Sequence, residues 1–112
     1  TCIRDYLHVA DLAIGHVAAL AKLESQPGLV TYNLGTGQGQ SVFNVIKTYE
    51  NATGIGIPYS VGPRRAGDVP VSYTDPSLAE QELGWRAQRT ILDICRSAHK
   101  WQTRNPLGYA DA

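Results

Sequence analysis

An α/β fold is the class that this sequence of 112 residues predicts. Apolar residues first alternate at every second position, as in a strand, then recur at helical intervals, and this change repeats along the chain. Proline and glycine fall where the periodicity changes, as expected at the ends of helices. The predicted order is β-α-β-α-β-loop-α-α, with some parallel strand pairing, in one domain that can bury a modest core.

The first third of the chain predicts a strand, a helix and a second strand. In residues 2–9, one set of side chains (Ile3, Asp5 and Leu7) alternates with another (Arg4, Tyr6 and His8), and we expect a strand there. Apolar residues at helical spacing predict a helix over residues 10–24, which ends near Pro27-Gly28. Residues 29–34 are β-branched and aromatic, so we expect a buried strand there.

The middle of the chain predicts a helix, a short strand and a loop. Ser41 is a suitable N-cap, and Gly54 stands where that helix should end. The apolar stripe of this helix comprises Val42, Val45, Ile46 and Tyr49. Residues 56–62 predict a short strand, and residues 63–74, with two prolines and a glycine, predict a loop.

Two helices complete the predicted order. Asp75 as N-cap, with Pro76 at the first helical position, predicts a short helix that Gly84 ends. Thr90 and Asp93 resemble a capping box with Asp in place of Glu, and they predict the start of the last helix. The apolar stripe of that helix comprises Ile91, Cys95, Ala98 and Trp101, and an Asn-Pro pair marks its end.

Composition and charge exclude several classes of function. Ten basic side chains balance ten acidic ones, so no overall charge favours nucleic acid or an anionic membrane, although a local basic cluster can still form. The most apolar stretch, residues 12–21, is interrupted by His16 and is far shorter than the roughly 20 residues of a membrane span. The first residues show no basic start followed by an apolar run, so no secretory signal is expected.

The cysteines and histidines indicate neither a disulfide framework nor a metal site. Cys2 and Cys95 lie far apart in the sequence, so we expect buried reduced thiols and a cytoplasmic location. His8, His16 and His99 have no cysteine or carboxylate partners at the spacing of metal ligands.

The segment YNLGTGQGQSV, residues 32–42, has the layout of a nucleotide-binding turn without its details. A dinucleotide fingerprint needs G-x-G-x-x-G, and here Gln40 stands where the third glycine belongs. The nearest later carboxylate, Glu50, comes too early to receive a ribose, and the Gly-Lys-Ser/Thr of a Walker loop is absent. We therefore favour a structural turn, whose glycines permit positive φ, over a cofactor site.

The segment PRRAGD, residues 63–68, is a candidate holder of a nucleoside diphosphate. Arg64 and Arg65 are adjacent, and guanidinium groups bind phosphate oxygens in a bidentate way and stay charged. Asp68 can accept hydrogen bonds from a ribose diol. A solvated arginine pair on a surface loop is the alternative that this segment leaves open. Arg4-Asp5 is either a structural ion pair or a second element aimed at the same phosphates.

Five segments of the chain form a recognisable series: IRDYLHVADLAIGHVAAL, YNLGTGQGQSV, PRRAGDVP, LGW and KWQTRNPLGY. They occur in the same order and at similar spacing in UDP-glucose 4-epimerases, and the closing W-Q-x-x-N-P-x-G-Y is specific to that family. The chain thus resembles the C-terminal part of these longer enzymes. This implies an α/β portion of an extended short-chain dehydrogenase/reductase, in the NAD-binding Rossmann superfamily. Residues 1–112 would be the substrate-binding portion, with the N-terminal NAD-binding domain outside this chain.

The resemblance assigns roles to residues in two of these segments. In similar epimerases, the positions of Arg4 and Arg65 face the diphosphate of UDP. The position of Asp68 holds the uridine ribose, and Ala66 and Gly67 line the turn. These roles agree with those that charge and geometry suggest for the same residues.

Ser72 stands where some members of the family have a bulkier tyrosine close to the sugar ring. A small residue at this position should leave room for a larger sugar. We therefore expect UDP-N-acetylhexosamines as possible substrates in addition to UDP-glucose and UDP-galactose.

The resemblance also implies an isomerase of galactose metabolism that interconverts UDP-glucose and UDP-galactose through an NAD-dependent 4-keto intermediate. The whole enzyme would be a cytoplasmic homodimer, with no nucleic acid or membrane partner. The catalytic Tyr-x-x-x-Lys pair and the glycine fingerprint for NAD are absent from this chain, so we expect no catalytic or cofactor-binding residue in it. The alternatives are another nucleotide-sugar dehydratase or epimerase of the superfamily, or an inert fragment that only binds UDP.

Overall fold

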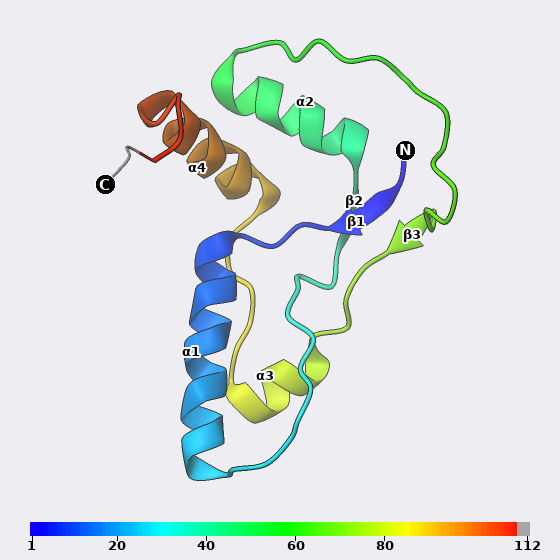
Figure 1. The fold of residues 1–112 in the computed structure, drawn as a ribbon. Helices are drawn as coiled ribbons and strands as arrows, with labels where there is room; N and C mark the ends of the chain where they lie inside the picture. Colours follow the sequence, from blue (N-terminus) through cyan, green and yellow to red (C-terminus); the bar gives the residue numbers. More distant parts are fainter. Residues whose placement is uncertain (110–112) are drawn as a thin grey trace.

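The computed structural model describes residues 1–109, which form a small sheet and four helices. The elements are β1 (Ile3–Asp5), α1 (Val9–Ser25), β2 (Gly39–Ser41), α2 (Val42–Thr53), β3 (Val71–Ser72), α3 (Ser77–Leu83) and α4 (Ile91–Arg104). Helices and strands follow one another in the predicted order, although two of the three strands lie at other residues than predicted. Figure 1 shows α2 against α4 on one side of the sheet and α1 with α3 on the other.

β1 is the central strand of a sheet with the order β2-β1-β3. It pairs with β2 antiparallel, where Arg4 lies opposite Gln40, and with β3 parallel, where Arg4 lies opposite Ser72. The predicted parallel pairing is confirmed for one of these two pairs. β1 is much shorter than the predicted strand at residues 2–9, because the chain leaves the sheet after Asp5.

The other two predicted strands are wrong. Residues 29–34 and 56–62 belong to no strand, and the side chains of Leu29 and Val61 are 99% and 79% exposed. Within residues 1–109, no strand pairs with either segment, and a β-prone sequence forms a stable strand only when it has such a neighbour. β2 forms instead at the end of the glycine loop, and β3 lies inside the predicted loop at residues 63–74.

Helix ends follow the sequence closely. The Ser41 hydroxyl accepts a hydrogen bond from the amide of Asn44 and caps α2, and the last helix has the predicted capping box. In that box, the Thr90 hydroxyl accepts from the Asp93 amide while the Asp93 carboxylate accepts from the Thr90 amide. The glycines predicted to end α2 and α3 are both left-handed C-caps.

Two helices begin one residue away from their predicted start. α1 begins at Val9, and the ring of His8 accepts a hydrogen bond from the amide of Ala10, which makes His8 the N-cap. α3 begins at Ser77 rather than Pro76. The N-cap of α3 is Pro76 rather than the predicted Asp75, although the Asp75 carboxylate accepts a hydrogen bond from the Ser77 amide at 3.0 Å.

The hydrophobic core is smaller than predicted. Among the described residues, only Ala79, Trp85 and Cys95 are buried apolar side chains, and Cys2 is half-buried rather than buried. The radius of gyration is 16.9 Å, whereas a compact domain of this length would measure about 13 Å. No helix within residues 1–109 has both the length and the apolar character needed to cross a membrane.

Candidate functional site

Arg4 of β1 and Arg65 of the loop after α2 meet at the carboxylate of Asp68. Arg4 donates from Nη2 to Oδ1 at 2.9 Å. Arg65 donates from Nε and Nη2 to Oδ2, at 3.3 and 3.1 Å. The structure therefore brings together the three residues that the sequence nominated for a nucleoside diphosphate.

The parallel pairing of β1 and β3 sets this geometry. The amide of Ile3 donates to the carbonyl of Pro70 at 2.9 Å, which holds the end of the loop against β1. The Arg4 side chain is also fixed, because its Nη1 donates to the carbonyl of Ile3 at 2.8 Å. Within the loop, a turn brings the amide of Asp68 to 3.4 Å from the carbonyl of Arg65, so the two side chains fold back onto one another.

The cluster carries a net positive charge. The hydrogen bond from Arg65 lowers the pKa of Asp68, assisted by the positive charges of Arg65 and Arg4 and opposed by partial burial. Asp68 is therefore a carboxylate at neutral pH. Arg4 and Arg65 carry two positive charges against this single negative charge, so the cluster has a net charge of +1.

The remaining predicted site residues lie beside this cluster. Ala66 and Gly67 form the exposed turn between Arg65 and Asp68. Ser72 lies on β3 opposite Arg4 and is exposed.

Asp5 does not form the ion pair with Arg4 that was considered from the sequence. Its carboxylate accepts hydrogen bonds from the amides of Thr36, Gly37 and Thr74 and from the Thr36 hydroxyl. Burial alone would raise the pKa of Asp5, but these donors outweigh burial and lower it. Asp5 thus ties the glycine loop and the segment after β3 to the central strand.

The glycine loop is a structural turn, as favoured from the sequence. The amides of Thr36 and Gly37 point to Asp5 at 3.0 Å and so are not available for a phosphate. Of the three glycines, Gly37 has a positive φ of 72°. Gly35 is buried because Asp5 and Thr74 approach its backbone closely.

Gly35→Ala is expected to lower the free energy of unfolding by about 1–2 kcal/mol, as overpacking of a filled site does. The added Cβ would lie 2.6 Å from Oδ2 of Asp5 and 2.6 Å from Cβ of Thr74. Urea denaturation measures the change. Gly56→Ala is the matched control, since its Cβ would meet nothing nearer than 3.9 Å. Equal stability of the two variants would contradict the role of Gly35.

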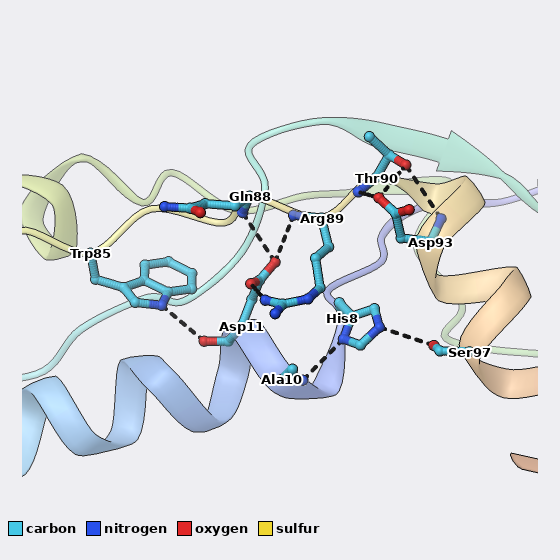
Figure 2. Close-up of polar contacts among 9 residues, drawn as sticks. All are labelled: His8, Ala10, Asp11, Trp85, Gln88, Arg89, Thr90, Asp93 and Ser97. Atoms are coloured by element: carbon cyan, nitrogen blue, oxygen red, sulfur yellow. Dashed lines mark hydrogen bonds and ion pairs between the residues drawn. The ribbon is translucent and has the colours of Figure 1, made fainter.

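Asp11 is an important residue that the sequence analysis missed. It is 2% exposed, and its carboxylate accepts from the amides of Gln88 and Arg89 at 3.0 and 2.9 Å. The Arg89 guanidinium also pairs with it, and the Trp85 indole donates to the carbonyl of Asp11 at 2.9 Å (Figure 2). An acidic residue in the first turn of an otherwise apolar helix was the available signal, and nothing in the sequence indicated its partners.

Figure 2 also shows how the start of α1 is joined to α4. Nδ1 of His8 accepts from the amide of Ala10, so Nε2 carries the proton and donates to the Ser97 hydroxyl at 2.9 Å. This contact and the Asp11 cluster fix the N-terminus of α1, which follows β1 directly. Both interactions tie the start of α1 to the C-terminal segments of the fold.

Within residues 1–109, no three His, Cys, Asp or Glu side chains gather as a metal site would require. The same residues contain no tyrosine followed four positions later by a lysine.

Known proteins are similar to this chain over its whole length. No family model matches the sequence. UDP-glucose 4-epimerase of Bifidobacterium longum is 54% identical over all 112 residues of this chain, which are 33% of that protein.

Solved structures of UDP-glucose 4-epimerases are also similar to this chain. The B. longum UDP-glucose 4-epimerase in complex with NAD+ and UDP has a TM-score of 0.91 and 53% identity, over 97% of this chain and 32% of that one. The UDP-glucose 4-epimerase of Stenotrophomonas maltophila with bound NAD and formylated UDP-arabinopyranose also gives 0.91, with 48% identity over 95% of this chain and 32% of that one. These matches confirm the predicted α/β fold of the extended short-chain dehydrogenase/reductases.

The chain spans about one third of the length of the curated relatives that it matches. The similarity in sequence covers all 112 residues, and the similarity in fold covers 97% of the chain. We conclude that the chain is homologous to the C-terminal part of the UDP-glucose 4-epimerases.

Proposed function

We propose that the chain is the UDP-sugar-binding portion of a UDP-glucose 4-epimerase, an isomerase that interconverts UDP-glucose and UDP-galactose in galactose metabolism. The convergence of Arg4 and Arg65 on Asp68 is the observation that carries the proposal. Homology to these enzymes, one of them solved with UDP, supports it.

The residues of the cluster would hold the nucleotide end of the substrate. Arg4 and Arg65 bind the diphosphate, because their guanidinium groups match phosphate oxygens, and Asp68 accepts hydrogen bonds from the uridine ribose. Ala66 and Gly67 line the turn without filling it. Binding energy gained at this end orients the sugar at the reacting carbon.

The sugar end must stay loose, because an epimerase presents both faces of one carbon in turn. Ser72 suits this requirement: it is small, exposed and adjacent to Arg4 in the sheet. We propose that it also admits the N-acetyl group of a UDP-N-acetylhexosamine.

NAD does not fit the residues of this chain. The glycine loop lacks the dinucleotide fingerprint, and its Thr36 and Gly37 amides are held by Asp5. We propose that a preceding domain binds NAD, which supplies hydride transfer at C4 of the sugar. The whole enzyme would be a cytoplasmic homodimer, and the unpaired thiols of Cys2 and Cys95 agree with a reducing compartment.

The proposal is tested by incubating the full-length enzyme with each UDP-sugar and following the conversion by NMR. Wild-type enzyme is expected to convert both UDP-galactose and UDP-N-acetylgalactosamine, whereas Ser72→Tyr should keep the first activity and lose the second. If the wild type converted only UDP-galactose, the proposal that Ser72 admits an N-acetyl group would be wrong. Conversion of neither sugar would remove the proposed activity.

A further inference from the structure

We propose that Asp68 makes the site selective for nucleoside diphosphates over inorganic phosphates. Asp68 binds Arg65 in the empty site, and only a ligand with a ribose can replace Arg65 as the hydrogen-bond donor to Asp68 when a phosphate takes Arg65. This inference rests on the proposed function, in which the cluster holds the diphosphate and ribose of UDP. It gives Asp68 a second role, as an internal competitor for the guanidinium group that a phosphate needs.

The two oxygens of Asp68 are divided between the two arginines. Oδ1 accepts a hydrogen bond from Arg4, and Oδ2 accepts one from Arg65. The Cys2 thiol, 3.9 Å from Oδ2, is only a weak donor and cannot replace a guanidinium group. Any anion that draws Arg65 away therefore leaves Oδ2 without a strong partner.

The two arginines differ in their freedom to move. Arg4 lies on the central strand, is bonded to the carbonyl of Ile3 as well as to Asp68, and has a side chain only 31% exposed. The side chain of Arg65 is 84% exposed and belongs to a loop. An exposed pair of this kind is weak, so Arg65 is the group that can exchange Asp68 for a phosphate.

The free energy of binding therefore differs between an inorganic phosphate and a nucleoside diphosphate. Pyrophosphate must displace a carboxylate from Arg65 and afterwards lies next to that unsatisfied negative charge, which opposes binding. A nucleoside diphosphate also brings ribose hydroxyls, which donate to the oxygen that Arg65 leaves. The ribose thereby offsets the loss that the phosphate causes.

The test is Asp68→Asn in the full-length enzyme, titrated calorimetrically with inorganic pyrophosphate and with UDP. Pyrophosphate should bind about two- to fivefold more tightly than to wild type, as expected when a weak exposed ion pair no longer competes. UDP should bind about tenfold or more weakly, because hydrogen bonds to a charged acceptor are lost. The preference for UDP over pyrophosphate thus falls roughly 20-fold or more.

Three further variants make the result specific. Glu24→Gln removes the same charge from an exposed position on α1 and should leave both affinities unchanged. Asp68→Ala should repeat the effect of Asp68→Asn on pyrophosphate, which guards against misfolding of one variant. Adding Arg65→Ala to Asp68→Asn should abolish the gain in pyrophosphate affinity.

The outcomes separate this inference from the function on which it rests. If wild-type enzyme binds UDP but neither Asp68 variant binds pyrophosphate more tightly, the competitor role is wrong and the UDP site stands. If wild-type enzyme does not bind UDP, both the site and the competitor role are wrong.

Discussion

Asp11→Ala is expected to lower the free energy of unfolding by about 3 kcal/mol, at the low end of the range for breaking a buried ion pair. Asp11 is 2% exposed, but the side chain of its partner Arg89 is 40% exposed and can regain some water. The substitution also removes the acceptor for the amides of Gln88 and Arg89. Urea denaturation of the full-length protein measures the loss.

The pH dependence of this effect distinguishes lost charge from lost packing. Burial opposes ionisation of Asp11, but the amides of Arg89 and Gln88 and the Arg89 charge outweigh it and lower the pKa below the usual 3.8. The stability that the carboxylate contributes is therefore complete above pH 3.8 and is lost as the pH falls through the lower, folded value. The difference between wild type and Asp11→Asn should accordingly shrink in strong acid. Glu24→Ala, an exposed position on the same helix, should change stability little at any pH.

Arg65→Ala in the full-length enzyme is expected to weaken UDP binding by about 1.5–3 kcal/mol, the range for hydrogen bonds to charged groups. The loss arises because a charged partner of the diphosphate is removed while Arg4 remains. Arg64→Ala is the matched control, since it removes the same charge from the neighbouring position in the same loop. Calorimetric titration with UDP compares the two variants. Equal affinities for wild type and Arg65→Ala would exclude Arg65 from the site.

Local features of the fold could be read from the sequence, whereas strand positions could not. The caps at Ser41 and Thr90 were predicted because a cap depends on residues within one helical turn. The strand predicted at residues 29–34 was wrong because pairing depends on a distant neighbour that local preference cannot supply. β3, of two residues, carried no pattern long enough to detect.

In the candidate site, too, local contacts could be predicted from the sequence more directly than long-range ones. Arg65 and Asp68 lie three positions apart and form a local group that the sequence shows directly. For the distant Arg4 the residues left two interpretations open, and the resemblance to a known family favoured the phosphate-facing one. An ion pair between Arg4 and Asp5 was considered, although consecutive residues of a strand point to opposite faces of the sheet. The structure follows that rule, since Arg4 turns to Asp68 and Asp5 to the glycine loop.

The unpaired, β-prone residues 29–34 affect how the protein behaves during its synthesis. An extended β-prone run without a partner strand readily adds to other chains, so the 112-residue polypeptide alone should precipitate during expression. In a protein as long as its relatives, the preceding two thirds emerge from the ribosome first and can fold before this run is synthesised. The order of translation would then shield the run from intermolecular β-aggregation.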